Sequence, residues 1–219
     1  MQILTNIENF TVFNILEYLQ DNGIGEADLN QLLSDFSCPI NPDVERFLKQ
    51  SAIEFTKKNQ SVTYLVFSND AALVGYFSIA LKPITVNAAN FSNTMKQKIA
   101  RVSEWNEEIG TFGLSAYLIA QLGKNFTDDA NLKISGQQLL EVAMTKIYEL
   151  QYLASGMVVF LETENSEKLF HFYDTVNGFK AFETREWKYH TLIKNIAKFY
   201  YIDAISAGRY NKNGDKDGY

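Results

Sequence analysis

TENSEKLFHFYDTVNGF, residues Thr163–Phe179, is the stretch on which the interpretation of the fold depends. The apolar residues of its second half have the i, i+3, i+4, i+7 spacing of an amphipathic helix: Leu169, Phe172, Tyr173 and Val176. Asn165 or Ser166 can cap the start of this helix, and Asn177 followed by glycine is a typical helix end. The stretch therefore predicts a short helix that carries Tyr173 on its apolar face.

Two roles are open to Tyr173. An aromatic residue on the apolar face of a helix is usually part of the core, and the spacing alone favours this interpretation. A tyrosine whose hydroxyl reaches the edge of a site can instead donate a proton. The elements that surround the helix bear on the choice.

Strands that are buried in the sheet are predicted before this helix. The runs LSAYLIAQL (Leu114–Leu122) and GMVVFLET (Gly156–Thr163) are continuous and apolar, as expected at the centre of a sheet. A long helix is predicted between them, and an antiparallel strand pair or one long bent strand is predicted after Phe179. This order of elements predicts an α/β (α+β) fold with a mixed sheet.

The remaining segments complete this layout. Helices are predicted at three places early in the chain, residues 12–19, 28–33 and 41–55. A β-hairpin is predicted over 61–81. Residues 82–110 are less regular, with one helix at 92–102, and form a long excursion between strands.

The composition excludes several classes of protein. A chain of 219 residues with 46% apolar and 14% aromatic residues can form a large core. The net charge of −6 provides no large basic field, so nucleic acid is a poor default partner. Two lysine clusters are interpreted as solvated helix faces: Lys49, Lys57 and Lys58, and Lys194 with Lys198. The sequence lacks a signal peptide and a membrane-spanning run, which predicts a soluble, cytoplasmic protein without a membrane partner.

The sequence predicts neither a metal site nor a thiol nucleophile. The single Cys38 cannot form an intramolecular disulfide, indicates a reducing compartment and is interpreted as a packing residue. His171 and His190 have no Cys or His near them in the sequence, so metal ligation is not expected. The motifs of P-loop, Rossmann and serine-hydrolase sites are also absent from the sequence.

The segment LKISGQQLLEVA begins the longest predicted helix with a capping box, because Ser135 is a good N-cap and Gln138 lies three residues later. A helix that starts after a buried strand and a loop presents free backbone N–H groups to an anion. We expect such groups to hold a phosphate or pyrophosphate, the donors being the backbone of Ser135, Gly136, Gln137 and Gln138. An ordinary well-capped helix is the alternative interpretation.

These features in this order resemble the GNAT superfamily of N-acetyltransferases, over residues 37–187. The resemblance is to the branch that includes toxin acetyltransferases: FSCPINPDVERFLKQSAIEF is similar to its opening, TYLVF and LVGYFSIAL to its second and third strands, and YLIAQLGK to its fourth. The acyl-CoA loop motif [Q/R]-x-x-G-x-[G/A] keeps only its last glycine, Gly136, with Ile134 at the earlier glycine and Asn131 nearest to the polar position. Phe179 follows Tyr173 by six residues, where the family has five.

The resemblance implies a GNAT fold, in which a mixed sheet is splayed between two parallel strands and flanked by helices. It implies a domain over 37–205, preceded by a helical extension (1–36) and followed by a flexible tail (206–219). Acetyl-CoA is the implied cosubstrate, without a metal. The residues expected to contact it are Ile119, Ala120, Gln121, Leu122, Asn131, Ser135, Gly136, Gln137, Gln138 and Asn165.

The implied reaction is direct attack of a primary amine on the thioester, with Tyr173 as the proton donor to the CoA thiolate. Candidate general bases, each more often a solvated surface charge, are Glu104, Glu107, Glu108, Glu162 and Glu164. Because the chain is acidic, we expect a small-molecule or protein amine as the acceptor. A tRNA-acetylating toxin and a GNAT-fold module that binds CoA or a protein without turnover are the alternatives. An acceptor pocket or homodimer contact is expected in the N-terminal helices and in residues 82–110.

Overall fold

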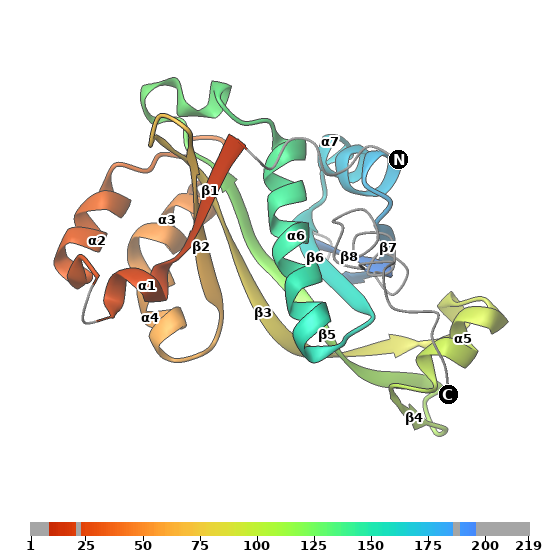
Figure 1. Cartoon of the computed structure of the whole chain (residues 1–219). Helices are drawn as coiled ribbons and strands as arrows, with labels where there is room; N and C mark the ends of the chain where they lie inside the picture. Colours follow the sequence, from red (N-terminus) through yellow and green to blue (C-terminus); the bar gives the residue numbers. More distant parts are fainter. Residues whose placement is uncertain (1–8, 21–22, 186–188, 196–219) are drawn as a thin grey trace, which may run out of the picture.

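The computed structural model describes residues 9–20, 23–185 and 189–195. These residues form one eight-stranded sheet (Figure 1). Seven strands follow one another across it: β1 (Phe10–Asn14), β2 (Val62–Ser68), β3 (Leu73–Asn87), β5 (Thr111–Lys124), β6 (Val158–Glu164), β8 (Tyr189–Asn195) and β7 (Lys180–Arg185). The short strand β4 (Glu104–Asn106) pairs with β5. All of these pairs are antiparallel except β5 with β6, which confirms the predicted mixed sheet.

Helices cover both faces of the sheet (Figure 1). The first face carries α1 (Ile15–Leu19), α2 (Gly25–Ser34), α3 (Pro42–Gln50) and α4 (Ala52–Lys57). The second face carries α6 (Gly136–Ala154), and α7 (Glu167–Phe170) with its continuation η4 (His171–Val176) packs against the same core. Successive side chains of a strand point to opposite faces, so one strand contributes to both cores. In β3, Tyr76 packs into the core under the helices of the first face and Phe77 into the core of the second face.

The first core is closed around Tyr76. Its ring packs edge-on against Phe36 at 5.3 Å, and its hydroxyl donates to the Val44 carbonyl at 2.6 Å. Burial raises the pKa of this phenol well above its usual value. A side chain at Gly123 would lie 2.3 Å from Val44 Cγ1, so the close approach of α3 to the sheet requires a glycine here.

The beginning of the chain departs from the helix predicted over 12–19. Phe10–Asn14 is strand β1, which pairs antiparallel with β2, and the helix begins only at Ile15. The Asn14 side chain accepts the Leu16 N–H at 3.0 Å and so caps this helix. Aromatic and β-branched residues in FTVFN suit an edge strand better than the first turn of a helix.

The predicted excursion 82–110 is more regular than expected. β3 continues through it to Asn87 and β5 begins at Thr111, so the two strands form an arm that extends beyond the rest of the sheet (Figure 1). Pro83 is tolerated because β2 pairs with β3 only as far as Ile79, which leaves this part of β3 an edge. The arm ends in the short helices η2 (Ala88–Asn90) and α5 (Asn93–Ile99), the latter within the helix predicted at 92–102.

The antiparallel strand pair predicted after Phe179 is present as β7 and β8. The predicted tail, 206–219, lies outside the described residues, as does the side chain of His190. Within the described ranges, no helix is long and apolar enough to cross a membrane.

Asn125 ties the end of β5 to two other parts of the chain. It is 5% exposed, and its amide accepts the Ser37 N–H at 2.9 Å and donates to the Leu73 carbonyl at 2.9 Å. The Phe126 N–H donates to the Ser37 carbonyl at 2.8 Å. These contacts fix the loop that leads from β5 to α6, through the short helix η3 (Thr127–Leu132).

We predict that Asn125→Ala lowers the free energy of unfolding by about 1–3 kcal/mol, because it removes the part-buried hydrogen bonds to the Ser37 N–H and the Leu73 carbonyl. Urea denaturation of the purified protein measures this change. Asn69→Ala, at an exposed turn, is the control and should change stability by less than about 0.5 kcal/mol. Equal stability of the two variants would show that the Asn125 contacts do not hold the loop.

Candidate active site

The parallel pair β5–β6 opens near the middle of the sheet. Only Tyr117–Ile119 of β5 pair with Val159–Leu161 of β6, although β5 runs on to Lys124 and β6 to Glu164. Opposite β3, the register shifts so that Ile119 pairs with Ile79 and Gln121 with Ser78, which leaves Ala120 as a bulge. A bulge bends its strand and increases its twist, so the strands diverge from this point. Of the four residues predicted to line the pantetheine, Ala120, Gln121 and Leu122 lie at this opening, and Ile119 is the last paired residue before it.

The closed end of the pair is fixed by the turn from α6 into β6. The Tyr117 hydroxyl donates to the Ser155 carbonyl at 2.5 Å, and the Gln151 amide donates to the Gly156 carbonyl at 2.6 Å. Gly156 has φ +120°, and a side chain there would lie 2.6 Å from the Tyr117 ring. The turn therefore needs glycine for both its backbone angle and its contact with β5.

The start of α6 has the predicted capping box. The Gln138 N–H donates to Ser135 Oγ at 3.1 Å, and the Ser135 N–H donates to Gln138 Oε1 at 2.9 Å. The box uses two of the four N–H groups that we expected to face an anion. Those of Gly136 and Gln137, in the first helical turn, have no intrahelical partner.

Gln137 contributes a further polar atom at this helix start. Its Nε2 donates to Glu141 Oε1 at 3.0 Å, whereas its Oε1 is buried and has no hydrogen-bond partner among the described residues. An unsatisfied buried acceptor of this kind is uncommon, because it carries the full cost of desolvation. A ligand that donates an N–H or O–H group would satisfy it.

Tyr173 lies in a π-helical turn, which accounts for the longer spacing to Phe179. The Asn177 N–H donates to the Phe172 carbonyl five residues earlier, at 3.2 Å, and η4 spans His171–Val176. A π-turn absorbs one extra residue in a helix and is common at functional sites. It also rotates the following residues, so Val176 is 57% exposed and does not continue the predicted apolar stripe.

The Tyr173 ring is enclosed by aromatic neighbours. It lies 4.9 Å from the Phe172 ring and 5.9 Å from the Phe179 ring, both in edge-on geometry. Desolvation raises the pKa of its phenol to about 12, and its hydroxyl has no hydrogen bond to any described residue. Phe172 is also the nearest group to the position of a side chain at Gly136, at 3.8 Å. The Tyr173 helix and the start of α6 therefore meet.

The other residues predicted from the sequence are spread over the core, the loops and the arm. Ile134 is 1% exposed and part of the second core, while Asn131 is half-buried in η3 and Asn165 is exposed after β6. Glu162 and Glu164 alternate with the buried Leu161 and are exposed on the face of the sheet opposite α6. The remaining candidate bases, Glu104, Glu107 and Glu108, lie on the arm, away from the opening.

Lys194 was interpreted as part of a solvated helix face, but it lies in strand β8 and supports the end of the Tyr173 helix. Lys198 lies outside the described residues. Its Nζ donates to the Asn177 carbonyl at 2.7 Å and lies 5.5 Å from the centre of the Phe179 ring. Burial lowers the pKa of this amine. The signal was the alternation in YHTLIKN, which places Lys194 on the same strand face as the buried Leu192.

No metal site accompanies these residues within the described part of the chain, where no three His, Cys, Asp or Glu side chains gather closely enough to hold an ion. Cys38 is 2% exposed, and burial raises the pKa of its thiol. A buried thiol with a raised pKa is a packing residue and not a nucleophile.

No family model and no curated protein matches this sequence. The structure is similar to that of AtaT complexed with acetyl-methionyl-tRNAfMet, with a TM-score of 0.62 and 16% identity over 89% of this chain and 99% of that one. It is similar to a mutant of KacT, with a TM-score of 0.59, 14% identity and coverage of 89% and 99%. It is also similar to an AtaT mutant toxin bound to the C-terminus of the antitoxin AtaR and to acetyl-CoA, with a TM-score of 0.56 and 13% identity over 90% of this chain and 97% of that one. The chain shares the fold of these proteins, which is the GNAT fold that the resemblance implied.

The comparison corrects one expectation. The net charge of −6 led us to expect that nucleic acid would be a poor partner, but AtaT, which has this fold, is complexed with a tRNA. Net charge describes the whole chain, whereas binding depends on the local arrangement of charges. The exclusion of nucleic acid was therefore wrong.

We predict that Tyr173 ionises near pH 12 in the folded protein. Its pKa is raised above 10.0 by burial, so the folded chain holds the phenol proton more tightly than the unfolded chain. The resulting stabilisation is complete below pH 10 and is lost as the pH rises through about 12. The difference between the ultraviolet titration curves of the wild type and of Tyr173→Phe isolates the ionisation of this phenol. A midpoint near the ordinary tyrosine value would show that the ring is solvated.

Proposed function

We propose that the protein is an N-acetyltransferase that transfers the acetyl group of acetyl-CoA to the amino group of an amino acid attached to tRNA. The arrangement that supports the proposal is that the parallel pair β5–β6 opens at Ala120 while the Tyr173 helix contacts the start of α6. Such a transfer requires groups that bind the cosubstrate and a group that donates a proton. The GNAT fold supplies them here as an open strand edge, free helix N–H groups and a buried phenol.

The residues present fit acetyl-CoA. The N–H groups of Gly136 and Gln137 suit its pyrophosphate, because a helix start offers both donors and a favourable dipole. The open backbone edge of β5 from Ala120 to Leu122 can hydrogen-bond the amides of the pantetheine arm as a strand would. The buried Oε1 of Gln137 can accept a ligand N–H or O–H. The loss of the family glycine at Ile134 does not affect donors that belong to the backbone.

The reaction needs one proton acceptor and one proton donor. The neutral amine attacks the thioester carbonyl, a C–N bond forms, the C–S bond breaks, and the electron pair leaves on the sulfur of CoA. The ammonium proton passes to water or to a carboxylate at the opening, the thiolate takes a proton from Tyr173, and the resulting phenolate regains a proton from solvent before the next turnover. A phenol with a pKa of about 12 is fully protonated at neutral pH. The same apolar surroundings also raise the proton affinity of the thiolate, which brings the two groups closer in pKa.

The acceptor is the finer part of the proposal. AtaT complexed with acetyl-methionyl-tRNAfMet supports an aminoacyl-tRNA, whose amino group is a primary amine. A small-molecule or protein amine is the alternative acceptor. The two acceptor classes differ in size and charge, so a direct assay separates them.

We predict that the wild type transfers labelled acetyl from acetyl-CoA to aminoacyl-tRNA with a kcat/KM at least about tenfold higher than to the free amino acid or a basic peptide, because the tRNA adds binding contacts. Acid precipitation of the tRNA counts the product. Deacylated tRNA is the control and should accept no label. Equal transfer to free amino acids would assign the protein to small-amine acetylation.

We predict that Tyr173→Phe lowers kcat by about 10²–10⁴-fold, because the thiolate loses its proton donor. The affinity for acetyl-CoA, measured by thermal shift, should stay within about twofold, since the phenol acts on the leaving group. Tyr152→Phe, at an exposed position near the other end of α6, is the matched control. Unchanged turnover would remove Tyr173 from the mechanism. Binding of acetyl-CoA without transfer by the wild type would favour a module without turnover.

A further inference from the structure

Most of the described cations without ion pairs lie on the arm, residues 82–116. Elsewhere, most described Lys and Arg side chains lie within ion-pair distance of a carboxylate: Arg46, Lys49, Lys57, Lys58, Lys133, Lys146 and Lys180. On the arm, four cations make no ion pair with any described residue: Lys82, Lys96, Lys98 and Arg101. Outside the arm, Lys124 and Lys168 also make no ion pair with a described residue, so the arm holds the larger group of uncompensated cations but not all of them.

These cations share one side of the arm. Ile84 and Val86 face α5 across an apolar cavity of about 220 Å³, which Met95 and Ile99 also line. Lys82 alternates with Ile84 and so belongs to the same face of β3. At 100° per residue, Lys96 and Lys98 flank the inward stripe of Met95 and Ile99, and Arg101 follows the end of α5.

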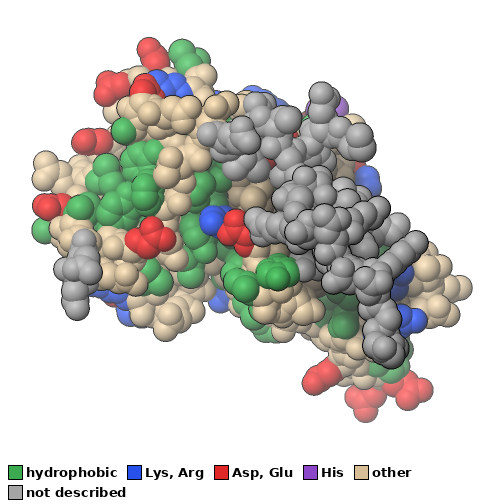
Figure 2. Space-filling view, viewed as in Figure 1, with side chains coloured by type: hydrophobic (Ala, Val, Ile, Leu, Met, Phe, Trp, Pro, Cys, Tyr) green, Lys and Arg blue, Asp and Glu red, His purple; other side chains and the backbone are tan. Residues whose placement is uncertain are grey.

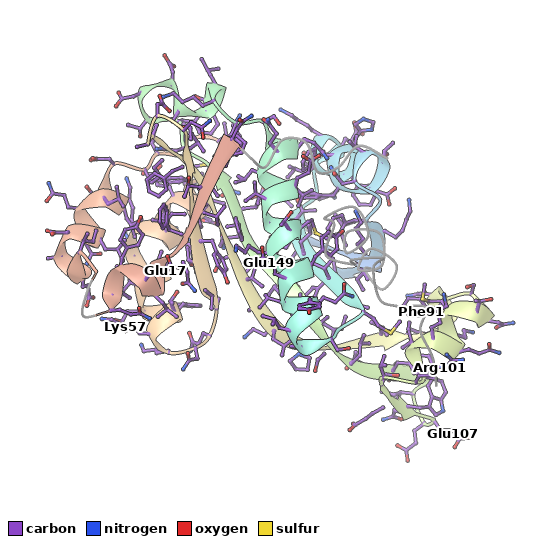
Figure 3. The ribbon with its side chains drawn as sticks, viewed as in Figure 1. Glu17, Lys57, Phe91, Arg101, Glu107 and Glu149 are labelled. Carbon is purple, nitrogen blue, oxygen red and sulfur yellow. The ribbon has the colours of Figure 1, made fainter. Side chains whose placement is uncertain are left out.

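Acidic side chains occupy the opposite side. A second hollow is lined by Thr85, Glu104, Asn106, Glu107, Thr111 and Gly113. Thr85 alternates with Ile84 and Val86, so this hollow opens on the other face of the arm. Figure 2 shows acidic side chains at the tip of the arm, and Figure 3 shows both Arg101 and Glu107 on it. The charges of the arm are therefore separated between its two faces.

The strands that carry the basic side of the arm continue into the sheet as far as the candidate active site. Lys82 pairs with Ala116, which precedes the bulge at Ala120 by four residues, or about 13 Å of strand. Val86 pairs with Phe112, eight residues or about 26 Å from the bulge. Lys82 is on the same β3 face as Ser78, whose partner Gln121 lies at the opening. The positive charge of the arm thus begins about four residues from the bulge, beyond the closed end of the β5–β6 pair and on the face opposite α6.

We infer that this basic side of the arm binds the sugar–phosphate backbone of the acceptor RNA while the aminoacyl end lies at the opening. The inference rests on the proposed function, and it deepens it by naming the RNA-binding surface. Phosphates need cations that are not already neutralised, and the arm offers four of them along one face. An RNA contact confined to the arm is also compatible with an acidic chain, because the acidic side faces away from it.

The test removes three of these charges. The arm variant is Lys96→Gln, Lys98→Gln and Arg101→Gln, and the matched control is Arg46→Gln, Lys58→Gln and Lys146→Gln. Both variants lose three positive charges, but the control residues lie outside the arm, on or next to α3, α4 and α6. Binding of purified tRNA is measured from low to moderate salt, together with circular dichroism to verify folding.

The arm variant should bind tRNA about 10- to 100-fold more weakly at low salt, and its plot of log K against log salt should be shallower by about 2–3. The control should stay within about threefold of the wild type. The KM for aminoacyl-tRNA should rise in the arm variant, while acetyl-CoA affinity and transfer to a small amine stay unchanged. Equal tRNA affinities and slopes for the two variants, or no tRNA binding by the wild type, would overturn the inference.

These readouts separate the inference from the proposed function. A wild type that binds tRNA through the arm but does not acetylate aminoacyl-tRNA would refute the proposed acceptor and leave the binding surface in place. A wild type that acetylates aminoacyl-tRNA, with an arm variant that behaves like the control, would refute the surface alone.

Discussion

The parting of β5 from β6 is the constraint on which the candidate site depends. A parallel pair that continued to the ends of both strands would satisfy the backbone groups of Ala120–Leu122 within the sheet and leave none for a ligand. Two features limit the pairing to three residues on each strand: the bulge at Ala120 and the turn at Gly156, which Tyr117 holds at the closed end. Since β5 stays paired with β3 and β6 with β8, each strand remains anchored on its outer side while the inner edges separate. The opening is thus rigid, as a site for an extended ligand should be.

The burial of the Tyr173 ring is compatible with the proposed role of its phenol as a proton donor. Its ring packs between Phe172 and Phe179 as a core residue would, and the same desolvation keeps its phenol protonated. The π-turn is what makes the extra residue before Phe179 acceptable, because it takes up that residue without unfolding the helix end. Lys194 then closes the end by donating to the Asn177 carbonyl. The helix is therefore fixed at its carboxyl end by β8 and in its middle by aromatic contacts.

Much of the fold could be predicted from the sequence, and the failures have physical causes. The capping box at Ser135 is a local interaction between neighbouring residues, so its signal is contained in four letters. The bulge at Ala120 gave no signal, because LSAYLIAQL has no Gly, Pro or change of pattern at that point, and the bulge arises from pairing with β3. The short β1 was mistaken for helix because its stability comes from pairing with β2 and not from its own propensity. The six-residue spacing after Tyr173 was visible, but the hydrogen bonds that form the π-turn were not.

The charge of the chain shows most clearly why a whole-sequence property cannot replace geometry. A net charge of −6 averages over neutralised pairs on the helices and over an arm whose two faces have opposite sign. Strand alternation creates this separation, since residues that are adjacent in β3 point to opposite faces. Carboxylates on the far face also keep the average acidic without approaching a ligand on the near face. Under these conditions the sign of the total charge carries no information about the surface that a polyanion would meet, and the arrangement of individual side chains on the sheet decides it.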